Sequence, residues 1–170
     1  LRVDYAVDGV AMLETDSRFA GYSEPDARRV FDDLLRRIEA VPGVQSAALL
    51  RGLPMDVNGV GIVVDSSDGQ KGSTLEAAVI AAAPGFFDTV RIPLLHGRVF
   101  DERERADTPR VAVISERMAR QYFGAVNAVG RRFRPVNDPN SWAEVIGVVR
   151  DTGTGDFDDD VLDPIGPMFY

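Results

Sequence analysis

The sequence contains no cysteine, only one histidine, and no apolar run long enough to cross a membrane. Without cysteine, a disulfide scaffold, a thiol nucleophile and a zinc–thiolate site are all excluded. A membrane helix needs about 18 or more consecutive apolar residues, and a phosphate-binding loop needs the Gly-x4-Gly-Lys-Ser/Thr pattern, which is also missing. The chain opens at Leu1 with residues too polar for a signal peptide, so we expect it to be a piece of a longer protein.

Positive charge is also scarce, because 19 basic residues face 27 acidic ones and leave a formal net charge of -8. No lysine or arginine stripe reverses this locally, so binding to a nucleic acid is not expected. The content of 45% hydrophobic and 27% charged residues is that of a globular protein. The length of 170 residues suits one large domain or two small lobes.

The clearest helix is predicted to begin after Ser23, a favourable N-cap, because residues 24–26 supply an acidic first turn that contains proline. The apolar residues that follow occupy one helical face: Ala27, Val30, Phe31, Leu34, Leu35 and Ile38. On the other face, Asp32 and Asp33 each stand four residues before an arginine. Pro42 and Gly43 follow the last turn and end the helix.

Alternating or β-branched segments predict strands, and shorter helical patterns lie between them. The predicted strands cover residues 3–8, 44–50, 61–64, 75–83, 111–114, 130–134 and 142–149, the one at 130–134 with a basic exposed face. Residues 61–64 and 75–83 are expected to form a hairpin. We expect one short helix over 84–90 with Pro84 in its first turn, and another over 116–123 between Ser115 and Gly124. The charged residues 102–105 predict a solvated loop that is a candidate lobe boundary.

Several segments, taken in order, resemble the periplasmic core domain of MacB-type permeases, and most of all the large permeases of the acidobacterial type. The matching segments are residues 38–47, Ala-Pro-Gly-Phe-Phe at 83–87, Ile-Pro-Leu-Leu-His-Gly-Arg-Val-Phe at 92–100, Val-Ala-Val-Ile-Ser-Glu at 111–116, Ala-Arg-Gln-Tyr-Phe at 119–123, Gly-Arg-Arg-Phe at 130–133 and Val-Ile-Gly-Val-Val-Arg-Asp at 145–151. No single segment is specific. The ordered set, which spans residues 25–151, carries the resemblance.

The resemblance implies an α+β fold with two lobes, mixed sheets and few helices. A porter-like lobe would comprise residues 1–105, with residues 151–170 returning to it, and a sabre-like lobe would comprise residues 106–150. It also implies the function, which is that of the extracytoplasmic domain of an ABC transporter permease of the MacB/FtsX kind. Such a domain is non-catalytic, binds a substrate or a partner protein, and transmits conformational change across the membrane.

The same resemblance implies a location and partners. The domain would stand on the periplasmic or extracellular side of the cell membrane, between the first two membrane helices, with both chain ends facing the membrane. Its partners would be its own transmembrane helices and a cytoplasmic nucleotide-binding subunit, together with a periplasmic adaptor or a second permease. Neither a nucleic acid nor a cofactor is expected, and the resemblance does not indicate the transported substrate.

Residues that carry chemistry elsewhere favour ordinary roles here. His96 lies in a predicted turn without an acidic neighbour in sequence, so a structural or surface role is favoured. Asp156, Asp158 and Asp160 have the spacing that begins an EF-hand loop, but Val161 replaces the required glycine and Pro167 replaces the final glutamate. A solvated acidic loop is therefore favoured at residues 156–163.

Further candidates are also better explained by structure than by catalysis. Arg98 is expected to pair with a carboxylate and fix the lobe junction. The aromatic residues Phe86, Phe87, Tyr122 and Phe123 are expected to belong to the core. Residues 153–155 are too short for a phosphate cradle. We therefore predict no catalytic, cofactor-binding or metal-binding residue, and no enzyme activity.

Two alternatives to a permease domain remain open from the sequence. A free-standing extracytoplasmic ligand-binding or sensor domain would contain a deep, pre-formed pocket. A hydrolase would need His96 beside a serine hydroxyl and a buried carboxylate.

Overall fold

The computed structural model describes residues 9–11, 13, 22–51, 58–65, 74–101, 103–104, 108–151 and 168–169. Three predictions concern residues outside these ranges. They are the strand at 3–8, the acidic loop at 156–163 and the position of the two chain ends facing the membrane. The elements in chain order are α1 (Glu24–Glu39), β1 (Leu50–Arg51), β2 (Asn58–Val64), β3 (Leu75–Val79), β4 (Ala81–Ala82), α2 (Phe86–Thr89), β5 (Leu94–Gly97), β6 (Val111–Ser115), α3 (Glu116–Phe123), β7 (Arg132–Pro135), β8 (Ala143–Val149) and β9 (Met168–Phe169).

The two longer helices begin where their caps predict. The Ser23 hydroxyl accepts from the Asp26 N–H at the start of α1, and the Ser115 hydroxyl accepts from the Met118 N–H at 3.2 Å at the start of α3. Gly124 ends α3 in the left-handed conformation, with φ of 70°. None of the described helices combines the length and the apolar character that a membrane crossing requires.

The prediction for the short helix α2 was wrong in its first turn. Pro84 was expected inside that turn, but α2 begins only at Phe86. Gly85 stands between them with φ of 83°, a left-handed conformation that cannot belong to a right-handed helix. Pro84 therefore precedes the helix and its cap.

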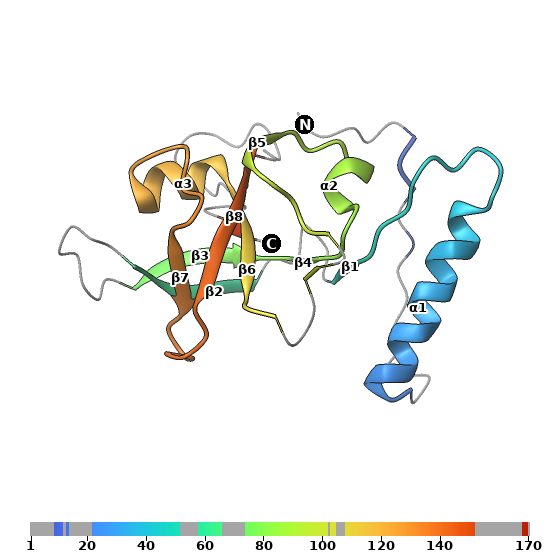
Figure 1. Cartoon of the computed structure of the whole chain (residues 1–170), viewed down its shortest axis with the longest axis horizontal. Coiled ribbons are helices and arrows are strands. Elements are labelled where there is room, and N and C mark those ends of the chain that lie inside the picture. Colours follow the sequence, from blue (N-terminus) through green and yellow to red (C-terminus); the bar gives the residue numbers. More distant parts are fainter. Residues whose placement is uncertain are drawn as a thin grey trace.

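Seven strands form one mixed sheet in the order β5-β8-β6-β9-β3-β2-β7. The pairs β6–β8 and β3–β9 are parallel, and the other pairs in this sheet are antiparallel. Because β7 also pairs with β8, the strands from β8 round to β7 close into a ring, and β5 joins β8 outside it. In Figure 1, β6, β7 and β8 cross β2 and β3. The predicted α+β fold with a mixed sheet and few helices is confirmed.

Two of the predicted strands are shortened or interrupted in the structure. Of the expected strand at 44–50, only Leu50 joins a ladder, because residues 44–49 have no partner strand within the described chain. The expected strand at 75–83 is interrupted at Ile80, since β3 pairs with β2 whereas β4 pairs with β1. The predicted hairpin of β2 and β3 is confirmed.

The sheet buries a separate apolar core on each face. Along β6, Val113 belongs to one core, and its neighbours Ala112 and Ile114 belong to the other, as the alternation of side chains in a strand requires. The first core also takes Phe86, Phe87 and Phe100, whereas the second takes Met118 and Ala119 from α3. Neither core takes a residue from α1, which stands apart from the sheet in Figure 1.

The predicted boundary between lobes at residues 105 and 106 stays a prediction. The large sheet takes β2, β3 and β5 from the first range and β6, β7 and β8 from the second. β9, from the C-terminal range, lies between β3 and β6.

Candidate functional site

An open cleft of about 610 Å³ lies where the first residues of β6 meet the segments before α2 and after β7. Its lining residues are Ala82, Pro84, Phe100, Glu104, Thr108, Pro109, Arg110, Val111, Ala112, Phe133, Pro135, Ser141 and Ala143. These residues come from both predicted lobes. Most of the lining is apolar, and the charged groups in it are Glu104 and Arg110. The cleft is therefore the candidate functional site of the described chain.

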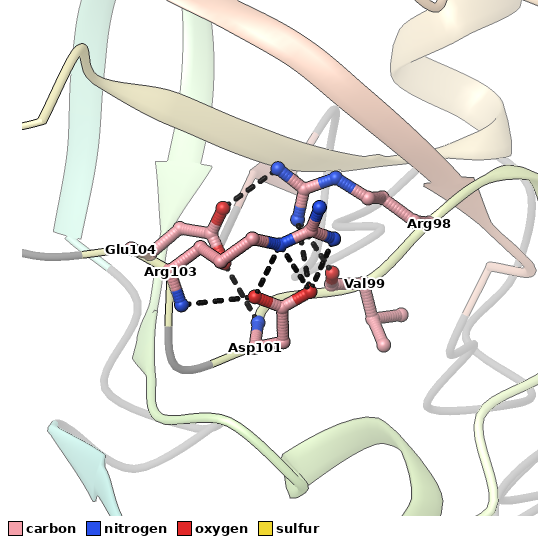
Figure 2. Close-up of polar contacts among 5 residues, drawn as sticks. All are labelled: Arg98, Val99, Asp101, Arg103 and Glu104. Carbon is pink, nitrogen blue, oxygen red and sulfur yellow. Dashed lines mark hydrogen bonds and ion pairs between the residues drawn. The ribbon is translucent and has the colours of Figure 1, made fainter.

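Glu104 of the cleft lining belongs to a network of charged side chains, whose contacts are drawn in Figure 2. Arg98 donates through Nη2 to Oε1 of Glu104 at 2.7 Å, and the Asp101 N–H donates to Oε2 of the same carboxylate at 2.7 Å. The Glu104 side chain is only 18% exposed. The hydrogen bond from Arg98 is the main cause that lowers the pKa of Glu104, and the bond from Asp101 acts in the same direction. Glu104 is thus ionised, and each of its two carboxylate oxygens accepts a hydrogen bond.

Asp101 and Arg103 form the outer part of the same network. Arg103 approaches Asp101 with its Nη2 at 2.6 Å and its Nε at 2.9 Å, and its backbone N–H donates to the same carboxylate at 2.9 Å. The side-chain bonds from Arg103 hold the pKa of Asp101 well below its ordinary value of 3.8. Arg98 is a further cation near Asp101, at 3.7 Å. One turn thereby joins two arginines to two carboxylates.

The backbone of the preceding segment explains how Arg98 reaches this position. Gly97 adopts φ of 75° at the end of β5, and the Arg98 N–H donates to the Ile146 carbonyl of β8 at 2.9 Å. A Cβ added at Gly147 would lie 2.1 Å from the Arg98 carbonyl oxygen, so the two chains can approach this closely only because both positions are glycine. The two glycines, Gly97 and Gly147, therefore determine the position of the Arg98 backbone beside β8.

The outcome for this turn is mixed. The predicted pairing of Arg98 with a carboxylate is confirmed. The prediction that residues 102–105 form a solvated loop was wrong for Glu104, because Arg98 draws its carboxylate into the cleft wall. Arg103 is exposed as expected, and residues 102 and 105 lie outside the described chain.

The cleft lining contains a second polar group, at Ser141. Ser141 is 7% exposed, and its backbone N–H donates to the Asp138 carbonyl at 3.2 Å. A hydrogen bond from the Ser141 side chain is the main cause that lowers the pKa of Asp138, with a smaller contribution from the charge of Arg110. Sequence reasoning missed this group, although an aspartate three residues before a serine in a turn is a recognisable signal.

The other candidates from the sequence lie on β5, in the two cores or outside the described chain. His96 lies on β5 opposite Val148, rather than in a turn, and is partly exposed. Among the described residues, no three His, Asp or Glu side chains gather closely enough to hold a metal ion. Phe86 and Phe87 are buried, while Tyr122 and Phe123 pack against the second core. Residues 153–155 lie outside the described chain.

The expected basic face of β7 is present and has an aromatic partner. The guanidinium groups of Arg132 and Arg134 lie 5.6 Å and 5.5 Å from the ring centroid of Trp142, the only tryptophan of the chain. Arg132 also pairs with Asp65 at 3.2 Å. Through these contacts the basic side chains hold β7 to its neighbours. The arginines and their partners are not cleft-lining residues, although Phe133 and Pro135 of the same strand are.

With this geometry described, comparison with known proteins identifies the family. The profile of the MacB-like periplasmic core domain matches residues 5–167, nearly the whole chain. The chain belongs to this family. The periplasmic core domain recognised from the ordered segments of the sequence is therefore confirmed. No curated protein sequence matches the chain.

Two solved structures, with TM-scores of 0.50 and 0.51, show the same fold at low sequence identity. The periplasmic region of MacB from Actinobacillus actinomycetemcomitans is 18% identical, with a TM-score of 0.51 over 86% of this chain and 60% of that structure. The extracellular domain of the noncanonic ABC-type transporter YknZ from Gram-positive bacteria is 18% identical, with a TM-score of 0.50 over 76% of this chain and 58% of that structure. A domain of a putative permease from Porphyromonas gingivalis is 21% identical, with a TM-score of 0.49 over 76% of this chain and 47% of that structure.

This MacB-like domain therefore spans roughly half to three-fifths of the length of the structures it resembles, 47% to 60%. Its cleft and its charged turn were described from this structure and not from the related ones. Low identity means that the neighbours support the fold alone, and that the roles of individual residues must be argued from this structure.

Proposed function

We propose that this domain works on the extracytoplasmic side of an ABC transporter permease, where it binds a substrate or a partner protein and transmits conformational change. It has no catalytic residue, cofactor or metal of its own in this proposal. Its partners are the transmembrane helices of the parent protein and a cytoplasmic nucleotide-binding subunit, with a periplasmic adaptor or a second permease outside the membrane. The observation that carries the proposal is the family match over residues 5–167.

The charged turn gives this proposal a structural basis. Arg98 follows β5, which pairs with β8, and its partner Glu104 lines the cleft together with the first residues of β6. A displacement of β5 relative to β8 would therefore act on the cleft wall through the bond between Arg98 and Glu104. The cleft residues would in turn bias the position of β5, because coupling between two sites is reciprocal.

A fluorescent label in the cleft tests the proposal. The chain has no cysteine, and Thr108 is an exposed residue of the cleft lining, so Thr108→Cys places one label there. We expect the emission of an environment-sensitive label to change between the nucleotide-free parent complex and the complex trapped with ATP and vanadate. The matched control is Glu39→Cys at the end of α1, outside the cleft.

Two results would contradict the proposal. The first is emission from the Thr108 label that stays constant while the complex hydrolyses ATP. The second is turnover of a chemical substrate by the domain itself. Of the two alternatives, the free-standing binding domain requires a deep pocket, whereas the cleft in the described chain is open to solvent.

A further inference from the structure

The cleft lies on the path that β9 would take if it were extended, and its part between Ala82 and Val111 is named the slot. β9 lies between two strands, with Phe169 opposite Val79 of β3 and opposite Ile114 of β6. Each further residue along β9 would move one step toward Ala112 and Val111 on the β6 side. On the other side it would move toward Ala82. Ala82, Val111 and Ala112 are all lining residues of the cleft.

The β6 edge of this slot presents backbone groups that could bind a strand. The Glu144 N–H donates to the Arg110 carbonyl at 3.0 Å, so the carbonyl of Arg110 faces β8. Successive residues of a strand direct their backbone groups to opposite edges, so the N–H and C=O of Val111 face away from β8 and toward the slot. Within the described residues, β9 pairs with β6 only at Ile114, and no strand pairs with Val111 on this edge.

The same reasoning applies to the β4 edge. The Ala83 N–H donates to the Leu49 carbonyl at 3.0 Å, so Ala83 faces β1. Its neighbour Ala82 therefore directs its N–H and C=O to the other edge, which is the slot. Two strand edges thus face each other across the cleft. Pro84 and Pro109, which have no N–H, line the cleft just outside these edges and mark where pairing must stop.

We propose that this slot is filled by the polypeptide that continues β9 in the parent protein, as an extended strand antiparallel to β6. The inference rests on the proposed function only in that the domain belongs to a longer permease chain. Related structures are longer than this chain, which spans 47% to 60% of them. Continuity with β9 favours this occupant over a separate peptide, because a strand already in register extends without the entropy of association.

The occupied slot has a consequence for the function of the domain. The added strand would leave the sheet between β3, from the first predicted lobe, and β6, from the second. A pull on that strand would be applied to the centre of the sheet rather than to a loop at its margin. The cleft is then a path for motion and not a pocket for a small ligand.

Hydrogen exchange in the full-length permease, without nucleotide, tests the occupancy directly. We expect the Val111 amide to exchange within about tenfold of the Ala112 amide, which faces β8. Exchange of the Val111 amide at the rate of an exposed loop amide, while the Ala112 amide remains protected, would overturn the proposal. Hydrogen exchange is measured without nucleotide and without transport. An unprotected Val111 amide would therefore contradict the occupied slot alone, whereas constant emission from the Thr108 label would contradict the proposed function.

Cysteine cross-linking identifies the occupant. Ala82→Cys in the full-length protein is combined with single cysteines at successive positions after residue 170, and the 170-residue region has no native cysteine to interfere. We expect cross-links within one chain at alternate positions, the period of a strand. Cross-links between two chains, or no alternation, would refute the proposal.

A proline substitution provides the matched control. Val111→Pro removes an N–H that faces the slot and leaves the bonds to β8 in place, whereas Val111→Ala keeps the N–H. An occupied slot predicts that Val111→Pro lowers the melting temperature of the full-length permease by several degrees more than Val111→Ala does. Equal melting temperatures would show an open edge, on which proline is tolerated, and would overturn the proposal.

Discussion

Helices α1 and α3 start from the same local signals and end in different surroundings. Each is amphipathic and has a serine N-cap that accepts a backbone N–H. In α3, Met118 and Ala119 are fully buried against the sheet. Along α1, no residue from 25 to 39 is buried, and Val30 on its apolar face is 42% exposed. Local sequence therefore determines that a helix forms, while the energy that secures it comes from the surface it packs against.

The largest expected effect comes from the tightest contact of the sheet. Gly147→Ala would place a Cβ 2.1 Å from the Arg98 carbonyl oxygen, so a backbone must move. We expect a loss of about 3 kcal/mol or more in the free energy of unfolding. In Gly43→Ala, after α1, the added Cβ would meet no atom within 4 Å, and only the positive φ of 94° disfavours alanine. We expect this variant to lose about 1–2 kcal/mol in the free energy of unfolding. Urea denaturation of both variants measures the contrast, and equal losses would contradict it.

The second comparison concerns the apolar faces of the two helices. Met118→Ala removes a fully buried side chain and should cost about 2–5 kcal/mol. Leu34→Ala, at a partly exposed position of α1, should cost about 1 kcal/mol or less. Thermal and chemical unfolding of the two variants tests this difference. A loss at Leu34 as large as that at Met118 would mean that α1 is packed as firmly as α3.

The smallest expected effect concerns the charged turn and depends on pH. The pKa of Glu104 is lowered in the folded state, chiefly by Arg98, from the ordinary value of 4.5. The unfolded state therefore binds more protons near that pH. The stability from Glu104 is complete above pH 4.5 and is lost as the pH falls through the lower folded pKa.

We therefore expect the unfolding free energy of the unchanged protein to fall more than that of Glu104→Gln between pH 6 and pH 3. The difference should reach at most about 1 kcal/mol, because solvent screens a partly exposed pair. Arg98→Gln removes the main cause of the pKa shift and should reduce the acid dependence in the same way. Unfolding curves at several pH values measure it. If both variants retain the full acid dependence, the turn does not contribute as described.

Much of this fold could be predicted from sequence, because several signals are local. Ser23, Ser115 and Gly124 mark helix ends through their own backbone and side-chain geometry, so the starts of both longer helices and the end of α3 were predicted where they are observed. The β-branched run of β8 has no local competitor and was also predicted. The segment at 44–49 has strand-like composition too, yet it forms no ladder because strands require partners that composition does not reveal.

The candidate site was predictable only in part, for the same reason. Arg98 could be expected to find a carboxylate, since several acidic residues follow it within one turn of sequence. The partner, Glu104, could not be identified, because its position depends on how the turn after Phe100 folds back. The closure of the ring by β7 and β8 and the two facing edges at Val111 and Ala82 depend on register, which no residue encodes alone.

The ring of strands also constrains when this protein can acquire its structure during synthesis. β2 must wait for β7, about 70 residues later in the chain, and β5 must wait for β8, about 50 residues later. Until then, apolar strand faces and unpaired edges leave the ribosome or the translocation channel uncovered. A nascent chain of this kind needs protection from aggregation over most of its length, and its first half is not expected to fold ahead of its second.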